Sequence, residues 1–447
     1  MCDRNKVAYN SIVRDSLKVS MPLLFSLLLQ NLINVTDTIF LGRVGEVELG
    51  ASALAGVFYM AVYFIGFGFG VGVQVLVARL NGERQYDKIG SIVWQSLMFL
   101  SVMAIVIIAL TLLFVPMSFE AIISSAAIRG ATLDYLLIRI VGLLPAFFTI
   151  IYRSFFVGIK RANVLVYSAI AMTLSNVILN YLLIFGVGSI APMGIKGAAL
   201  ASVLSECIGV VFYLLYTRFV NMSVYAFRFF QAFDATVIRR ILNVSVWTML
   251  QYFISIFSWF LFFLAIEHIG ERPLAVSNVV RSLATMLFVI VSSFATSTSS
   301  MAGNAMGSND IPRILPIGKV NIMLCSAILV PVLVMIAIFP EGTLAIFTDS
   351  DQLISESVSS LYVMLTYFVF SIPGCILFNV VLGTGNTKVS FAIEMLAIFI
   401  YILVVGAIAA FKPPVWVCWF SEHIYWVATL LASVYYLMKA DWWKKTI

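Results

Sequence analysis

Charged residues are scarce in this chain. They make up 11% of its 447 residues, whereas apolar residues make up 62%. Soluble domains carry about 25% charged residues on average, so this composition excludes an ordinary soluble domain. Histidine occurs only at His268 and His423, which leaves little for histidine-based catalysis or a histidine metal site. Five scattered cysteines lack metal-ligand spacing, and we interpret them as small core residues: Cys2, Cys207, Cys325, Cys375 and Cys418.

Long apolar segments recur along the whole sequence. The polar N-terminal stretch MCDRNKVAYNSIVRDSLKVS has no apolar core and cleavage site of a signal peptide, so we expect the first apolar helix to be retained. A helix needs about 20 residues to cross a bilayer. Twelve such segments predict an all-α polytopic membrane protein: 17–41, 52–78, 92–115, 134–158, 165–187, 197–219, 240–266, 276–301, 319–340, 358–382, 389–411 and 419–438.

Basic residues gather in alternate loops. The loops after even-numbered segments carry Arg79, Arg84, Lys160, Arg161, Arg239 and Arg240, among others. Loops after odd-numbered segments are richer in acidic residues, such as Glu46, Glu120 and Glu341. The positive-inside rule therefore predicts that both termini are cytoplasmic. The net charge of +6 is accounted for by this topology, so we expect no nucleic-acid partner.

The two halves of the chain resemble each other at a constant offset. KVSMP, which contains Ser20, resembles NVSVW, which contains Ser245; Gly82 and Gly307 match, as do Gly158 and Gly383, and each pair is 225 residues apart. Six spans per half predict two parallel six-helix lobes related by a pseudo-twofold axis along the membrane normal, with a central cleft. We expect an N-terminal lobe at 1–220, a cytoplasmic linker at 221–238 and a C-terminal lobe at 239–447.

Asp37 lies inside the first apolar segment, in QNLINVTDTIFLG. A carboxylate in hydrocarbon costs about 2.5–3.5 kcal/mol by the lower estimates unless water or a partner receives it. Gln30, Asn34 and Asp37 are spaced four and three apart and share one helix face, which should point into the bundle. This pattern predicts a functional site, with ion or proton coupling as its leading use.

Several longer stretches resemble the multidrug and toxic compound extrusion (MATE) family, bacterial type. They are QNLINVTDTIFLGRVGEVELGASALA, YRSFFVGIKRANVLVYSAIAMTLSNVILNYLLIFG and MGIKGAALASVLSE. The resemblance covers nearly the whole chain and implies a secondary antiporter of the bacterial inner membrane. Such a protein exports cationic or amphipathic drugs while Na⁺ or H⁺ enters, by alternating access of two lobes. We expect membrane lipids around it, a monomeric state and no cofactor besides the coupling ion.

The resemblance also implies a coupling site. One branch of the family uses an Asp on span 1, an Asn and an Asp four apart on span 5, and a hydroxyl on span 6. Asp37, Asn176 and Ser202 match, but Asn180 replaces the second acid. The resulting set of oxygen atoms suits Na⁺, and a buried carboxyl also takes up a proton more readily. The sequence leaves the choice of ion open.

Other charged residues within the apolar segments have two interpretations each. Glu206 follows Ser202 by one turn on the same face, so it is either functional, lining the cleft or assisting Asp37, or a hydrogen-bonded interior acid. Gln30 and Asn34 are further candidates for assisting Asp37. Glu394 is interpreted as a structural or gate residue. A second branch of the family uses acids on spans 7 and 10. Here span 7 has only Glu267, at its end beside His268, and span 10 has none, so we expect no such second site. Arg139 and Arg281 should snorkel or pair.

Proline, glycine and aromatic residues suggest further roles. The resemblance associates a proline placed like Pro22 with bending of span 1, and the alternative is a proline tolerated in a first helical turn.

GFGFGVG lies within a span and follows no strand, so its glycines should serve close helix packing and not dinucleotide binding. Candidates for contact with an organic cation, for which ordinary packing is the alternative, are Phe147, Phe148, Tyr152, Trp247, Tyr252, Trp259 and Met286.

Two other functions compete with antiport. A flippase for a lipid-linked or polysaccharide precursor can share this architecture, but it would need a cleft rich in basic residues. A membrane-embedded enzyme would need a metal or nucleophile constellation, which the two histidines do not provide.

Overall fold

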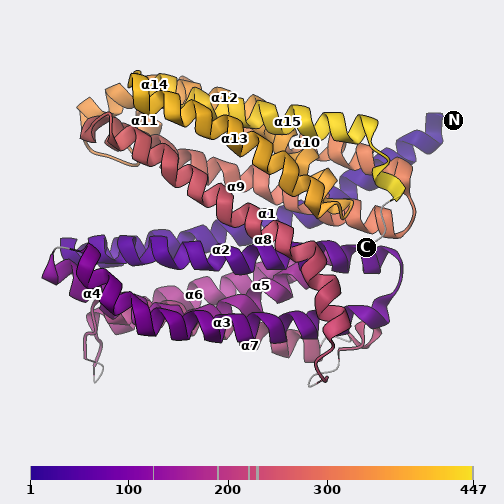
Figure 1. Cartoon of the computed structure of the whole chain (residues 1–447), viewed down its shortest axis with the longest axis horizontal. Helices are drawn as coiled ribbons and strands as arrows, with labels where there is room; N and C mark the ends of the chain where they lie inside the picture. Colours follow the sequence, from indigo (N-terminus) through magenta and orange to yellow (C-terminus); the bar gives the residue numbers. More distant parts are fainter. Residues whose placement is uncertain (1, 124, 189–190, 220–221, 228–230, 445–447) are drawn as a thin grey trace. The chain divides into compact units, whose positions relative to one another are not determined.

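The computed structural model describes residues 2–123, 125–188, 191–219, 222–227 and 231–444. Within the predicted linker 221–238, residues 221 and 228–230 lie outside the described residues. Almost all described residues are helical (Figure 1), so the predicted all-α fold class is confirmed.

The first half of the chain contains seven α-helices among the described residues. They are α1 (Cys2–Val44), α2 (Glu46–Gly82), α3 (Tyr86–Ile122), α4 (Ala126–Arg139), α5 (Leu143–Gly158), α6 (Asn163–Phe185) and α7 (Ile195–Phe219). A single 3-10 turn, η1 (Ile140–Gly142), joins α4 to α5, so these two helices together form the predicted fourth span. A second 3-10 turn, η2 (Ser223–Tyr225), follows α7.

The second half contains α8 (Ala235–Glu267), α9 (Glu271–Gly307), α10 (Ile314–Ile338), α11 (Pro340–Leu344), α12 (Asp351–Gly383), α13 (Thr387–Phe411), α14 (Val415–Cys418) and α15 (Phe420–Lys439). The 3-10 turns η3 (Ile311–Arg313) and η4 (Trp442–Lys444) complete the described elements. Of the cysteines, Cys325, Cys375 and Cys418 are buried as expected, whereas Cys207 is exposed.

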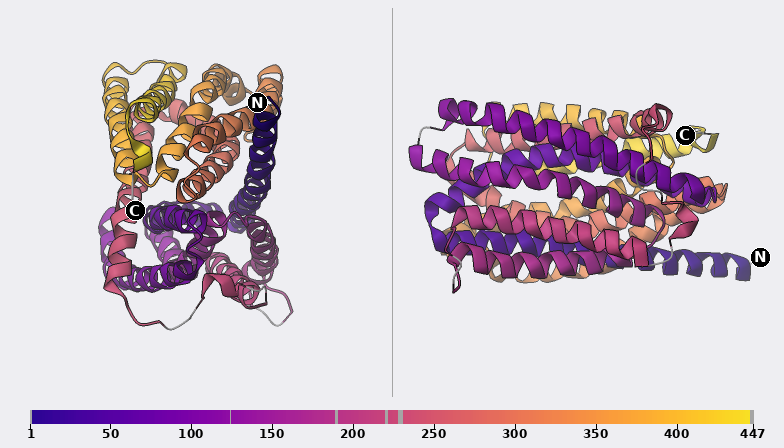
Figure 2. Two further views of the ribbon diagram at one scale, coloured as in Figure 1. Left: turned by 90° about the vertical axis from the view of Figure 1, so that its right-hand side faces the viewer. Right: turned by 90° about the horizontal axis from the view of Figure 1, so that it is seen from below.

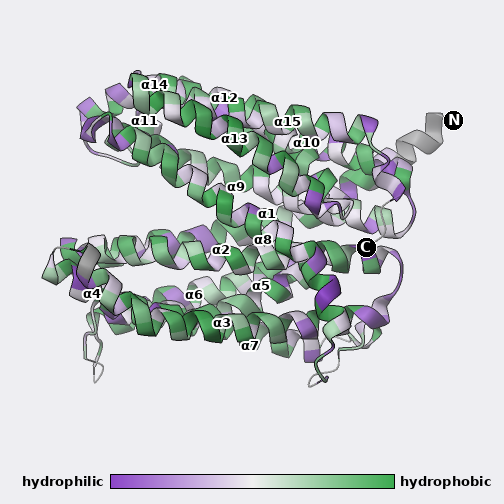
Figure 3. Cartoon of the chain, in the orientation of Figure 1, coloured by the Kyte–Doolittle hydropathy of each residue, from purple (hydrophilic) through white to green (hydrophobic). Residues whose placement is uncertain are grey.

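Eleven of the described helical segments are long and apolar enough to cross a membrane. They coincide with the first eleven predicted spans, and α15, with 20 residues, occupies the place of the twelfth. Hydrophobic residues cover most of the helices' length, whereas hydrophilic ones gather toward the ends and in the loops (Figure 3). The chain is therefore a multi-pass membrane protein.

The internal repeat predicted from the sequence reappears in the positions of the helix ends. Helices α2 and α9 begin at Glu46 and Glu271 and end at Gly82 and Gly307, and both pairs differ by the same 225 residues. Helices α7 and α15 begin at Ile195 and Phe420, again 225 apart. Packing repeats as well: Gly158 lies against Val77, and Gly383 lies against Ala302, the residue 225 positions after Val77. A duplicated unit accounts for all of these correspondences.

Helices α1 and α8 each contribute to two compact units. One unit is Phe25–Met249, called here the N-terminal unit, and the other is Met1–Leu24 with Leu250–Ile447, called the C-terminal unit. Within each unit the helices run nearly parallel or antiparallel, except that the first part of α8 crosses the others of the N-terminal unit steeply (Figures 1 and 2). The predicted lobe limits, 1–220 and 239–447, stay a prediction.

Hydrogen bonds tie each part of α1 to its own unit. In the C-terminal unit, Arg313 pairs with Asp15 at 2.9 Å. In the N-terminal unit, Thr173 Oγ1 donates to the carbonyl of Leu29 at 3.1 Å. Pro22 lies inside α1, far from its first turn, so the alternative of a proline in the first turn is wrong. A bending role for Pro22 stays a prediction.

The glycines of α2 provide surfaces for close packing, as predicted. A methyl group added at Gly66 would lie 2.2 Å from the Phe147 ring on α5. One added at Gly72 would lie 2.3 Å from Ser245 Oγ and 2.6 Å from its Cα on α8. Since a backbone atom cannot rotate away, α8 approaches α2 at Gly72 more closely than any side chain would permit.

We predict that Gly72→Ala lowers the stability of the protein by about 1–3 kcal/mol, because the added methyl overpacks the contact with Ser245. Gly56→Ala on the same helix is the matched control. A methyl there would meet no described atom within 4 Å, and alanine is the better helix former by about 1 kcal/mol. Thermal unfolding in detergent measures both, and equal melting temperatures would contradict the packing argument.

Candidate functional site

Three helices of the N-terminal unit bring Asp37, Asn176, Asn180 and Ser202 together. Asn176 and Asn180 are one turn apart on α6, so both face the same side, and both are completely buried. Asp37 comes from α1, where it is partly buried, and Ser202 comes from α7. The structure thus places the four predicted residues in one cluster, called here the Asp37 site. Their role in coupling stays a prediction.

Hydrogen bonds fix the carboxylate of Asp37. Asn180 Nδ2 donates to Asp37 Oδ1 and also to Asn176 Oδ1, the latter at 2.9 Å. Ser202 Oγ donates to Asp37 Oδ2 at 3.2 Å. Each carboxylate oxygen therefore has a donor from a different helix, which holds the carboxylate in one orientation.

One amide oxygen at the site lacks a partner. Oδ1 of Asn180 is buried and accepts no hydrogen bond from any described residue. A buried acceptor left unpaired costs about 1–3 kcal/mol, which a bound cation beside Asp37 would recover if the amide turned toward it. Carboxylate, amide and hydroxyl oxygens are hard ligands that suit Na⁺. Among the described residues, no group of three or more His, Cys, Asp or Glu side chains gathers as a metal cluster, and Asp37 is the one carboxylate among the four residues of the site.

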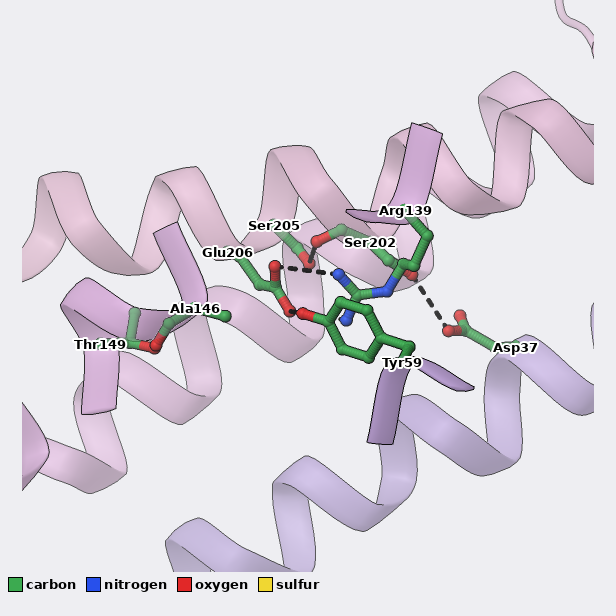
Figure 4. A network of polar contacts seen from close by, with 8 residues as sticks. All are labelled: Asp37, Tyr59, Arg139, Ala146, Thr149, Ser202, Ser205 and Glu206. Carbon is green, nitrogen blue, oxygen red and sulfur yellow. Dashed lines mark hydrogen bonds and ion pairs between the residues drawn. The ribbon is translucent and has the colours of Figure 1, made fainter. Parts of the chain in front are cut away.

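Arg139 pairs with Glu206 beside the Asp37 site (Figure 4). Its two terminal nitrogens donate to the two carboxylate oxygens of Glu206 at 2.7 and 3.0 Å. The expectation that Arg139 snorkels or pairs is thus resolved as a pair. The sequence did not identify Glu206 as its partner, because the two residues lie on α4 and α7 and no spacing rule links them.

The other predicted assisting residues do not join this hydrogen-bonded group. Asn34 is exposed and Gln30 is partly buried. Neither side chain forms a hydrogen bond with Asp37 in the part of the chain that the structure describes. Their assistance stays a prediction.

The residues proposed for substrate contact differ in exposure. Phe147 and Tyr152 are completely buried, and Tyr152 stacks on Tyr213 with centroids 5.4 Å apart. These contacts agree with ordinary packing. Met286 is exposed, and those of intermediate exposure are Phe148, Trp247, Tyr252 and Trp259. Substrate contact stays a prediction for the whole set.

An aromatic row on α2 was not predicted. Tyr59 stacks on Tyr63, and Tyr63 on Phe67, with centroids 6.2 and 6.4 Å apart. Arg139 lies 3.9 Å from the Tyr59 centroid, and Arg153 lies 5.5 Å from that of Phe67. The spacing of four between the aromatic residues was the available signal.

The C-terminal unit contains two buried acids. Glu394 on α13 accepts hydrogen bonds from Ser255 and, at 2.7 Å, from Tyr425 on α15. Glu422 on α15 accepts one at 3.0 Å from Tyr401 on α13. Neither acid has an ion pair among the described residues, so neutral donors solvate them, with Trp259 as a further donor to Glu422. Sequence reasoning identified Glu394 but missed Glu422.

The second repeat lacks a counterpart of the Asp37 site. The residues 225 positions after Asp37, Asn176, Asn180 and Ser202 are Phe262, Tyr401, Val405 and Val427. Phe262 packs against Tyr401 with centroids 6.3 Å apart. Aromatic and aliphatic side chains thus occupy the positions that are polar in the first repeat. Elsewhere in this unit, Glu267 and His268 form an exposed pair, 3.2 Å apart.

Comparisons with known proteins agree on one family. A family model described as MatE matches residues 22–182 and 247–408. The chain is 26% identical over 314 residues to a probable multidrug resistance protein NorM of Agrobacterium fabrum, a match that covers 67% of this chain and only 65% of that protein. Another protein of that name, from Aromatoleum aromaticum, is 24% identical over 424 residues, which cover 92% of this chain and 90% of the relative.

Solved structures are similar in fold. A MOP superfamily transporter from Pyrococcus furiosus Vc1 superposes with a TM-score of 0.89 at 20% identity over 97% of each chain. The eukaryotic MATE transporter AtDTX14 superposes with a TM-score of 0.84 at 16% identity over 98% of each chain. At these identities, the likeness supports the twelve-helix fold and nothing finer.

We predict that Tyr425→Phe destabilises the protein by about 1–3 kcal/mol, because the buried carboxylate of Glu394 then loses one of its hydrogen-bond donors. Tyr435→Phe on the same helix is the control, since Tyr435 is 69% exposed. Thermal unfolding in detergent separates the two, and an unchanged melting temperature for Tyr425→Phe would refute the role of this hydroxyl.

Proposed function

This chain belongs to the MatE family, and from that membership we propose that it is a secondary antiporter that exports cationic or amphipathic organic compounds in exchange for Na⁺ or H⁺. The relatives named as multidrug resistance proteins support the substrate class. A bacterial inner membrane location with both termini in the cytoplasm is part of the proposal, as is a monomeric state.

The observation that carries the proposal is the Asp37 site. A carboxylate on a membrane-spanning helix is oriented by Asn180 and Ser202 and lies beside an amide oxygen that lacks a partner. Such a group binds a cation when its charge is unbalanced and releases it when water gains access. The arrangement is suited to reversible loading, because the unpaired oxygen of Asn180 can serve as a further ligand for a cation beside Asp37.

In the proposed cycle, each residue has a defined task. Asp37 carries the charge that the cation balances. Ser202 and Asn180 hold the carboxylate, and the Asn180 amide can turn its oxygen toward Na⁺ or keep its nitrogen toward the carboxylate. Loading favours one of two conformations of the transporter, and the organic compound favours the other, so their bindings oppose each other. Because the equivalent position in the second repeat is Phe262, we propose that one cation moves per cycle.

A flippase of lipid-linked precursors remains the alternative function. It would hold a pyrophosphate with several unpaired basic residues. In the N-terminal unit, the charge of Arg139 is already balanced by Glu206. Among the interior arginines described there, Arg153 lies against Phe67 and has no acidic partner. One such residue does not make a basic cluster, which favours export of cations.

We predict that Asp37→Asn abolishes coupled export. Purified protein in liposomes that contain ethidium, an organic cation, would be given an inward Na⁺ gradient or an inward H⁺ gradient in separate runs. The wild type should move ethidium with one of the two gradients, which identifies the ion. Asp37→Asn should fall to the background of protein-free liposomes, because the amide carries no charge for the cation to balance.

Asp349→Asn, which changes an exposed loop acid, is the control and should export like the wild type. Export by Asp37→Asn at the wild-type rate under both gradients would overturn the role of Asp37. Movement of a lipid-linked pyrophosphate, with no movement of organic cations, would favour the flippase.

A further inference from the structure

We propose that Glu206 is a positioning residue that holds Arg139 away from Asp37, so that Asp37 remains free to bind its cation. The inference rests on the proposed function, because it takes Asp37 as the residue that binds the coupling ion. It adds a second carboxylate and an arginine to the site, and it gives them a task other than binding the ion.

The pair has the geometry of a fixed ion pair. Arg139 and Glu206 meet through two parallel hydrogen bonds, of 2.7 and 3.0 Å, and their side chains are only 14% and 12% exposed. Two parallel bonds between a guanidinium and a carboxylate define both distance and plane. Arginine keeps its charge throughout the physiological range, so Arg139 is a permanent cation inside the unit.

The surroundings are shaped for this pair. The ring of Tyr59 lies 3.9 Å below the guanidinium carbon, and its hydroxyl donates to Glu206 Oε1 at 3.5 Å (Figure 4). Gly142 leaves the room that the pair needs. A methyl group there would lie 2.6 Å from an Arg139 nitrogen and 2.8 Å from a Glu206 oxygen. A ring on one side and a missing side chain on the other therefore enclose the pair.

The pair is coupled to Asp37 through short connections. Ser202, which donates to Asp37, lies one turn before Glu206 on α7. The charge of Arg139 acts on Asp37, and the charges of Asp37 and Glu206 act on each other. Tyr135, one turn before Arg139 on α4, is within electrostatic range of all three. Arg139 thus has two acids within its field and binds one of them.

The repeat provides an independent link between the pair and Asp37. The residues 225 positions after Arg139 and Glu206 are Met364 and Leu431, and the residue after Asp37 by the same offset is Phe262. The pair and the aspartate are therefore present together in one copy of the duplicated unit and absent together from the other. An ion pair needed only for helix packing would have no reason to follow Asp37.

Charge balance gives the pair its function. Two carboxylates and one arginine leave a single excess negative charge. While Glu206 holds Arg139, that charge stays on Asp37 and must be balanced by an external cation. If Glu206 were neutral, Arg139 would be the nearest cation for Asp37. Because Arg139 is part of the same chain, its effective concentration beside Asp37 would exceed that of Na⁺ or H⁺ in solution. It would therefore neutralise Asp37 in place of either cation.

The test uses cation binding by the full-length protein in detergent, measured as the shift in melting temperature when Na⁺ replaces choline or when the pH is lowered. Wild type should show a shift with one of the two cations, and Asp37→Asn should lose it. Glu206→Gln should also lose it, and Glu206→Asp should keep it. The double variant Arg139→Gln with Glu206→Gln should regain it, since no internal cation is left to neutralise Asp37.

A second arm uses variants that keep Glu206. Arg139→Gln leaves Glu206 without its partner, so the double variant Asp37→Asn with Arg139→Gln should still respond to the cation, at Glu206. Other groups within the electrostatic field of the site or of the pair are common to all variants: Tyr59 and Tyr63 on α2, Tyr135 on α4, Arg153 on α5 and Cys207 on α7.

Three results would overturn the inference. They are a Glu206→Gln variant that keeps the full shift, a double glutamine variant that folds but does not regain it, and a wild type without any shift that depends on Asp37. Because this test measures cation binding and not transport, a failure of the inference can be distinguished from a failure of the proposed function. A protein that binds a cation at Asp37 but exports no organic compound would refute the antiporter and leave the inference intact.

Discussion

The charge of Asp37 sets the main constraint on the N-terminal unit. A carboxylate inside a membrane protein must be balanced by a cation or solvated by hydrogen-bond donors. The N-terminal unit supplies donors to Asp37 and places one arginine nearby. Asn180 and Ser202 supply donors, but the nearby guanidinium is committed to Glu206. The charge is therefore stabilised without being cancelled. A transporter needs such an intermediate state, because a fully neutralised acid would bind no ion and an unsolvated one would release none.

The C-terminal unit solvates its acids in a different way. Glu394 and Tyr401 lie on α13, Glu422 and Tyr425 lie on α15, and each tyrosine donates to the acid of the other helix. The rings of the two tyrosines also meet, with centroids 5.9 Å apart. This exchange joins two helices through four polar side chains, three of them buried, and leaves each acid with a neutral donor. The two repeats thus share helix positions and differ in the chemistry of their interiors.

The sequence predicted what depends on periodicity and missed what depends on the meeting of distant helices. Apolar length located the spans, and the constant offset revealed the duplication that the helix ends reproduce. The cost of a carboxylate in hydrocarbon singled out Asp37, and the family resemblance added Asn176, Asn180 and Ser202. Neither periodicity nor the resemblance could pair Arg139 with Glu206. Periodicity shows which residues share one face of a helix, but not which neighbouring helix that face contacts. Glu422 lies in the last predicted span and could have been singled out by the rule that identified Glu394, but its partner Tyr401 on another helix could not.

Duplication explains why one copy can hold a costly site. Once two similar units share the work of spanning the membrane, the polar positions of one can be filled with apolar side chains at no cost to the fold. Phe262 against Tyr401 is such a filling, and it replaces Asp37 and Asn176 with ring packing that stabilises its unit. The first copy keeps the carboxylate, its donors and the adjacent ion pair. Under the proposed function, stability and ion binding are thereby divided between the two copies of the duplicated unit.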